Sequence, residues 1–88
     1  MELSGNDALI VCRDADVEEA ARSAVWGRVT NAGQSCIAPQ RAYVERGVYD
    51  RFLKACQAEM AALRPGVDYG PVRTQAAREQ AQAIVREA

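Results

Sequence analysis

Cys36 is the residue with the clearest chemical potential in this chain. It follows a glycine and precedes a proline in the sequence NAGQSCIAP, which spans residues 31–39. A thiol reacts as its thiolate, and exposure together with local dipoles decides how readily it does so. Gly33 permits a tight turn that would present both the Cys36 side chain and its backbone amide, which could stabilise an oxyanion on an attacked carbonyl. The pattern predicts a presented nucleophile; the alternative is a small cysteine buried in a loop.

Glu2 is the second residue of chemical interest. It stands just ahead of Leu3 and Ser4, at the entrance to an apolar run over residues 8–12. A glutamate near a terminus is usually solvated. The loops at the chain ends of parallel strands, however, are where α/β proteins place their sites. A carboxylate held there in partly apolar surroundings would have a pKa above its usual range and could act as a general base.

The remaining cysteines, Cys12 and Cys56, are expected to have structural roles. One lies in the apolar run and the other on an apolar helix stripe, so we expect both to be alkylated well after Cys36. Three widely spaced cysteines make neither a disulfide framework nor a CxxC metal pattern. The chain has no histidine, which excludes a Ser-His or Cys-His dyad built from this chain alone.

Size and charge limit the classes of function. The 88 residues support one small domain at most, and the 49% hydrophobic fraction is rich in alanine, so the core should be thin. The net charge is −1 with mixed signs, which disfavours a nucleic-acid partner. No apolar stretch is long enough for a membrane span, and the start lacks a basic signal-peptide region. A cytoplasmic location without membrane association is therefore expected.

The elements that must position Cys36 are readable from periodicity. The run 8–12 is typical of a strand buried on both faces. Asp16 and Glu19 have capping-box spacing and predict a helix to about Thr30, with Glu18–Arg22 as an i,i+4 pair and a glycine stop at residue 33. Trp26 is expected to pack on this helix. We expect Asn31 and Gln34 to hold the turn by side-chain to backbone hydrogen bonds.

The second half of the chain predicts a strand over 41–45 and a helix over 49–63 with an Asp50–Lys54 pair. Gly47 is expected to separate the strand from the helix. Pro65 and Gly66 end that helix, and a third helix with a weak stripe covers 75–87. The order strand-helix-strand-helix-helix predicts an α/β fold with a parallel sheet and a right-handed crossover. No GxGxxG or GxxxxGK[ST] motif is present, so the motifs predict no dinucleotide or phosphate cradle.

Two segments together resemble the aldehyde dehydrogenase superfamily. ELSGN at residues 2–6 is similar to the family's E-L-G-G-K/N signature, and LIV followed by DADV resembles its strand and helix start. WG at 26–27, NAGQSCIA at 31–38 and Arg41 resemble its cysteine signature in the same order and spacing. VYDRF at 48–52 and GP at 70–71 resemble the segments that follow, so nearly all 88 residues can be matched.

The resemblance implies roles. Cys36 matches the nucleophile that forms a thiohemiacetal and then a thioester, and its amide matches half of the oxyanion hole. Glu2 matches the general base, and Leu3 matches a position whose backbone lies near the nicotinamide of NAD or NADP. The implied partner is a small-molecule aldehyde, and the implied architecture is part of the catalytic domain, associated in the full-length enzyme with further domains or as a homo-oligomer.

Departures from the family pattern also lead to expectations. Ser4 replaces a usual glycine, the loop between residues 63 and 70 looks shorter, and the coenzyme-binding and oligomerisation segments are absent. We therefore expect residues 1–88 to be a single partial domain, a fragment that does not turn over alone. Two alternatives remain open: a non-catalytic orphan fragment that acts as an interaction module, and a piece of a coenzyme-A-acylating aldehyde dehydrogenase.

Overall fold

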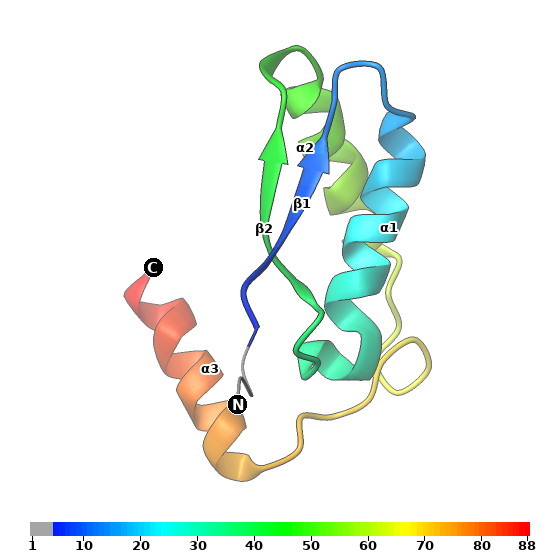
Figure 1. Ribbon diagram of the computed structural model, residues 1–88. Coiled ribbons are helices and arrows are strands. Elements are labelled where there is room, and N and C mark those ends of the chain that lie inside the picture. Colours follow the sequence, from blue (N-terminus) through cyan, green and yellow to red (C-terminus); the bar gives the residue numbers. More distant parts are fainter. Residues whose placement is uncertain (1–4) are drawn as a thin grey trace.

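The computed structural model describes residues 5–88, so the predicted site residues Glu2 and Leu3 lie outside the described residues. The described chain is an α/β unit in the expected order, with a two-stranded parallel sheet and three α-helices (Figure 1). Its elements are β1 (Asp7–Val11), α1 (Val17–Val29), the 3-10 turn η1 (Thr30–Gly33), β2 (Pro39–Val44), α2 (Arg46–Ala61) and α3 (Gln75–Glu87).

The two strands pair in parallel through the crossover helix α1. Ile10 lies opposite Tyr43 and Val11 opposite Val44, with an irregularity between Asp7 and Ala8. Strand β2 begins two residues earlier than the sequence predicts, because Pro39 at the first position needs no ladder donor. Parallel strands have their amino ends at the same edge, so the segments that precede β1 and β2 are neighbours.

Helix α1 begins as its capping pattern predicts. The Oδ1 of Asp16 accepts a hydrogen bond from the Glu19 amide at 3.1 Å. The expected Glu18–Arg22 ion pair is wrong. Arg22 bonds Glu19 one residue closer, and Glu18 instead meets Arg51 of α2 at 3.5 Å. The choice follows from packing, since α1 and α2 lie against each other and bring Arg51 within reach.

Helix α2 begins earlier than expected. Gly47, predicted to separate strand from helix, lies in the first turn of α2. A glycine at this position lowers the stability of the helix only through its low helix propensity. The expected Asp50–Lys54 pair is not among the ion pairs of residues 5–88. Starting at Arg46 places Val48 within the helix, and Val48 is buried.

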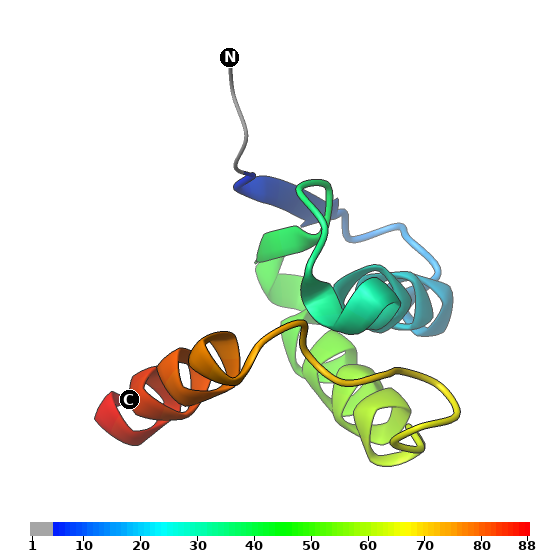
Figure 2. The same ribbon diagram turned by 90° about the horizontal axis from the view of Figure 1, so that it is seen from below.

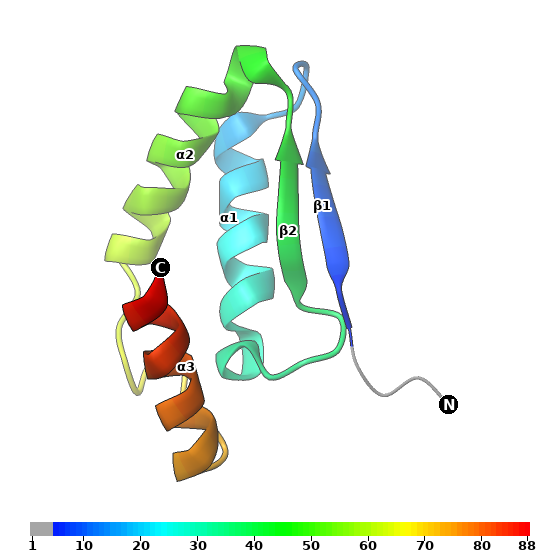
Figure 3. The same cartoon turned by 90° about the vertical axis from the view of Figure 1, so that its left-hand side faces the viewer.

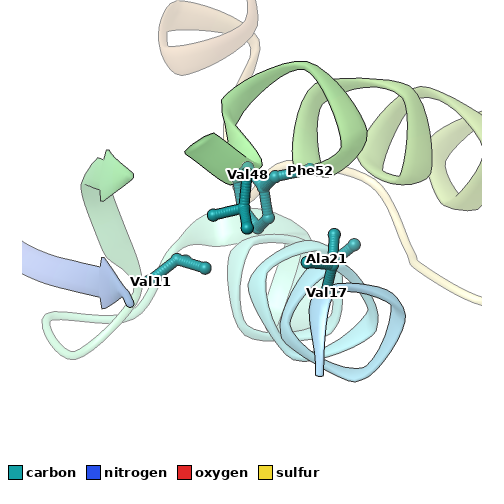
Figure 4. Packing of buried hydrophobic residues seen from close by; sticks show 5 residues of the cluster. All are labelled: Val11, Val17, Ala21, Val48 and Phe52. Atoms are coloured by element: carbon teal, nitrogen blue, oxygen red, sulfur yellow. The ribbon is translucent and has the colours of Figure 1, made fainter. Parts of the chain in front are cut away.

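The core lies between the sheet, α1 and α2, as the close view in Figure 4 shows. It consists of five side chains: Val11, Val17, Ala21, Val48 and Phe52. Phe52, the single aromatic residue of this core, is its largest side chain and is 7% exposed. The predicted thin core is confirmed, and most of its burial energy depends on a few contacts.

The other face of the sheet is bare in the described part. Figure 2 shows α1 and α2 on one side of the strands and no described helix on the opposite side. Ile10 is 72% exposed and its register partner Tyr43 is 53% exposed. The prediction of a strand buried on both faces is therefore wrong for residues 5–88, where only alternate side chains such as Val11 point into the core.

Helix α3 has the predicted bounds and a Thr74 cap, whose Oγ1 accepts from the Ala77 amide at 3.0 Å. It packs against none of the described helices and strands (Figure 3). Its apolar side chains stay outside, with Ile84 60% and Val85 73% exposed. No helix among residues 5–88 is long and apolar enough to cross a membrane.

Two packing predictions are wrong. Cys12, expected inside the sheet, is exposed, because it follows the last strand residue Val11 and begins the turn to α1. Trp26 is 68% exposed rather than packed, since the buried stripe of α1 is formed by Val17, Ala21 and Val25 on another face.

The loop after α2 contains an acid-sensitive contact. The Oδ2 of Asp68 accepts from the Arg64 amide at 2.7 Å and from its Nε at 3.2 Å, and these bonds hold the Asp68 pKa below its usual range. A lowered pKa stabilises the loop above about pH 3.9, and this stabilisation is lost as pH falls through the folded-state value. We expect the Arg64 amide NMR shift to titrate with a midpoint below that of a model aspartate. The Asp68→Asn variant should lack the transition, and a midpoint at or above about 3.9 would contradict the contact.

Candidate functional site

Cys36 is an exposed free cysteine at the tip of a turn. The turn closes through the Ala38 amide, which donates to the Ser35 carbonyl at 3.1 Å. Ala38 is buried at 1% exposure, while Ile37 is 74% exposed. The buried alanine anchors the turn to the protein and leaves the thiol outside. No residue among 5–88 accepts a hydrogen bond from the Cys36 amide.

The approach to Cys36 is a left-handed turn. Asn31 has φ 54°, Ala32 has φ 55° and Gly33 has φ 77°. The glycine stop is confirmed, yet two non-glycine residues share its conformation. Left-handed backbone costs about 1–2 kcal/mol for each non-glycine residue, so the surroundings must enforce it.

Asn31 and Gln34 enforce this turn, as predicted. The Asn31 Nδ2 donates to the Gln34 carbonyl at 3.3 Å, and the Gln34 Nε2 donates to the Asn31 carbonyl at 3.0 Å. The Gln34 amide donates to the same Asn31 carbonyl at 3.1 Å. Exposed hydrogen bonds of this kind contribute roughly 0.5–1.5 kcal/mol each, comparable with the left-handed strain.

Gly5 and Asn6, the described end of the first signature, lie against the second signature and the start of β2. A Cβ added to Gly5 would overlap the carbonyl oxygen of Cys36, so only a glycine permits this approach. Arg41 strengthens the contact: its Nη2 donates to the Asn6 carbonyl at 3.0 Å, and its Nη1 donates to the Tyr43 hydroxyl at 2.8 Å. The two candidate segments meet at the amino edge of the parallel pair, although α/β sheets commonly place sites at the carboxyl edge.

Sequence reasoning missed the roles of Gly5 and Arg41. The sequence predicts Gly5 only as part of a signature and Arg41 only as a matching residue at the start of a strand. The available signal is the position of these residues relative to the two strands. Because β1 and β2 pair in parallel, residues close to the start of each strand must be adjacent. The roles of Cys36, Glu2 and Leu3 stay predictions.

The described residues do not build an enclosed substrate or coenzyme pocket around Cys36. A cleft of about 710 Å³ lies between the turn at Ala32 and Gly33 and the segment that includes Tyr69 and Arg73. A second cleft of about 260 Å³ lies over Ala42, Phe52 and neighbouring apolar residues. Within residues 5–88 Cys36 lines neither cleft, and no group of metal-ligating side chains occurs. These residues offer no cradle that fits a dinucleotide.

Cys56 differs from the other two thiols. It is partly buried against the core, and this burial, with the nearby Glu59 carboxylate as a smaller cause, raises the pKa of the Cys56 thiol. A raised pKa gives stability that is complete below about pH 8.5 and is lost as pH rises through the folded-state value.

We therefore expect Cys56 to be the slowest of the three thiols toward iodoacetamide, and we expect folded stability to fall at alkaline pH. The Cys56→Ala variant should show a smaller loss of urea resistance between about pH 8.5 and 10. If the Cys56→Ala variant loses as much urea resistance at alkaline pH as the wild type, the loss does not come from ionisation of Cys56. Exposure no longer separates Cys36 from Cys12, because both are exposed.

Comparison with known proteins extends over the whole chain. The aldehyde dehydrogenase family model matches residues 1–88. Succinate-semialdehyde dehydrogenase (NADP+) 1 of Mycobacterium tuberculosis is 43% identical over 94 aligned residues, which cover 100% of this chain and 21% of the relative. The chain thus spans about a fifth of the length of the curated relatives it matches.

Solved structures share the fold. Lactaldehyde dehydrogenase from Escherichia coli superposes with a TM-score of 0.90 at 35% identity, over 97% of this chain and 19% of that one. A 1-pyrroline-5-carboxylate dehydrogenase from Thermus with bound NAD superposes with a TM-score of 0.91 at 28% identity, over 97% of this chain and 17% of that one. The α/β fold predicted from sequence is confirmed by these superpositions. Matched along its entire length by the family model and in its fold by solved members, the chain belongs to the aldehyde dehydrogenase family.

Proposed function

We propose that this chain is the nucleophile-bearing part of the catalytic domain of an aldehyde dehydrogenase, with Cys36 as nucleophile and Glu2 as general base. The observation that carries the proposal is the packing of Gly5 against the carbonyl of the exposed Cys36. This contact joins the glutamate-bearing signature to the cysteine-bearing one. Glu2 precedes Gly5 by three residues in the sequence.

The first chemical step is addition. The Cys36 thiolate attacks the aldehyde carbon, the Sγ–C bond forms, and the carbonyl electron pair moves to oxygen. The Cys36 amide, which no residue among 5–88 accepts from, supports this step because it can donate to the new oxyanion of the thiohemiacetal. A single donor of this kind contributes roughly 3 kcal/mol to transition-state stabilisation.

Oxidation and hydrolysis complete the reaction. A bound NAD or NADP would supply the hydride acceptor for oxidation of the thiohemiacetal, which would leave a thioester on Cys36. Water activated by Glu2 then adds to the thioester, and the acid leaves as the thiolate is restored. Leu3, by resemblance, would lie near the nicotinamide. The described residues offer no coenzyme cradle, so the coenzyme assignment rests on the family.

The substrate is proposed only as an aldehyde. The printed names of the relatives cover succinate semialdehyde, lactaldehyde and 1-pyrroline-5-carboxylate, so they do not select one. A coenzyme-A thiol in place of water as acyl acceptor is a variant of the same thioester chemistry. A cytoplasmic location and association with further domains or as a homo-oligomer belong to the same proposal.

An activated ester tests the nucleophile directly in this chain. p-Nitrophenyl acetate should acetylate Cys36 by attack at the carbonyl and loss of nitrophenolate, and peptide mass spectrometry reads each thiol separately. We expect Cys36 to be acetylated well before Cys12, although both are exposed. Equal acetylation of the two thiols would refute the proposal. Cys36→Ser should remove the fast phase and leave Cys12 unchanged.

The expectation of a partial domain has its own test. The purified chain, given NAD or NADP and a panel of aldehydes, should form no reduced coenzyme, because Cys36 lines neither of the two clefts described above. Clear turnover by the chain alone would overturn the claim that residues 1–88 need further structure.

A second candidate, a non-catalytic interaction module, is favoured by the surface. The face of the sheet that carries Ile10 and Tyr43 is uncovered in the described part, and parallel sheets are ordinarily covered on both faces. Docking onto an intact aldehyde dehydrogenase would bury it. Co-purification with such a relative, lost on Ile10→Asp, would favour this role, and a monomer that binds no relative would count against it.

A further inference from the structure

We propose that Gln34 is a positioning residue that couples the presentation of Cys36 to the segment leading into α3. This inference rests on the proposed role of Cys36 as nucleophile. The bond that carries it spans 39 residues of sequence: the Gln34 Oε1 accepts from the Arg73 amide at 2.6 Å. Arg73 precedes the Thr74 cap of α3, so the glutamine holds the start of that helix.

Every polar group of Gln34 is engaged. Its amide and Nε2 donate to the Asn31 carbonyl, its own carbonyl accepts from the Asn31 Nδ2, and its Oε1 accepts from Arg73. One side chain therefore ties the left-handed turn to a distant segment. Rotation of the Gln34 side chain away from Asn31 or Arg73 would break both of its side-chain hydrogen bonds.

The coupling matters because α3 has little else to hold it. It packs against none of the described helices and strands, and the cleft of about 710 Å³ separates the turn from the segment around Arg73. The Gln34–Arg73 bond joins the residue that follows Gly33, on one wall of that cleft, to Arg73 on the other wall. Movement of the 69–74 segment is thus transmitted to Gln34, two residues before Cys36.

The thiol responds because it lies between two closed turns. Gln34 and Asn31 close the turn on one side, and the Ser35–Ala38 hydrogen bond closes the other. Buried Ala38 keeps the second turn fixed. When the first turn loosens, Cys36 loses one of its two supports and its backbone amide loses a defined direction.

The test measures Cys36 alkylation and Arg73 amide exchange in Gln34 variants of the whole chain. Gln34→Ala removes both side-chain bonds. We expect Arg73 exchange about tenfold faster and Cys36 alkylation by iodoacetamide roughly threefold slower, toward the rate of the urea-unfolded chain, with Cys12 and Cys56 unchanged. Unchanged Cys56 labelling shows that the core remains folded.

Gln34→Glu separates the two bonds. Its carboxylate can still accept from the Arg73 amide but cannot donate to the Asn31 carbonyl. We expect Arg73 protection to be retained and the Cys36 rate to lie between those of the wild type and Gln34→Ala. Gln75→Ala is the matched control: Gln75 lines the same cleft, but its side chain bonds Glu79 on its own helix, so both readouts should stay at wild-type values.

Two failures are distinguishable. If Gln34→Ala frees Arg73 but leaves the Cys36 rate unchanged, the glutamine holds a loop and does not position the thiol, and the inference is overturned. If wild-type Cys36 already reacts at the rate of the unfolded chain, no site is formed, and the proposed function fails together with the inference.

Discussion

Replacing Phe52 with alanine should leave most of the chain unfolded at 25 °C. Phe52 is the largest member of the five-residue core and is 7% exposed. Removing a buried phenylalanine costs about 3–5 kcal/mol. A chain of this length has roughly 4–13 kcal/mol of total stability by the usual value per residue, and a thin core places it near the lower end. The loss is therefore comparable with the whole stability, and circular dichroism during urea titration measures it.

Ile84→Ala is the control for that loss. Ile84 lies on α3, is 60% exposed and belongs to a helix that packs against no other described element. Alanine also has the higher helix propensity, so the variant should unfold at the wild-type urea concentration or slightly above. Equal destabilisation by the two substitutions would show that α3 is part of the folded core and would contradict the described packing.

Gly33→Ala should disrupt the turn before Cys36 and destabilise the chain by about 2–4 kcal/mol. Two penalties combine. The residue has φ 77°, where a side chain is strained, and its Cβ would lie 3.0 Å from the Arg28 carbonyl oxygen. That oxygen is backbone of α1, so it cannot move without distorting the helix end. We expect Cys36 to lose its fast acetylation as the turn is displaced.

Gly66→Ala isolates the penalty for left-handed backbone strain from the penalty for the contact with Arg28. Gly66 has φ 79°, nearly the same backbone as Gly33, but an added Cβ would meet nothing within 4 Å. It should cost only the left-handed strain of about 1–2 kcal/mol and leave Cys36 acetylation unchanged. The difference between the two variants measures the contact with Arg28. If both variants cost the same, the close approach of Gly33 to α1 contributes nothing.

Local patterns predicted the elements well and the partners of exposed charges poorly. The bounds of α3, the Asp16 cap and the turn bonds of Asn31 and Gln34 depend on neighbours within four residues, so spacing carried the information. Glu18, by contrast, meets Arg51 on α2. Such a pair arises only after α1 and α2 dock, and no local spacing specifies it.

Solvent exposure was predicted less well for similar reasons. The sequence predicts that Cys12 and Trp26 pack, but both are exposed after the described elements dock. Hydrophobicity states what a side chain prefers. Whether a surface is available to cover it depends on which faces of the sheet and helices meet.

The sequence by itself determined the order of strands and helices, the glycine-dependent turn before Cys36 and the two signatures that identify the family. These depend on backbone restrictions and residue spacing, which act over a few residues. Only the tertiary structure decided that Gly5 lies against Cys36, that Arg41 reaches Asn6 and that Gln34 binds Arg73. Those contacts join residues 31 to 39 positions apart, and parallel pairing with packing of α1 and α2 is what brings such distant residues together.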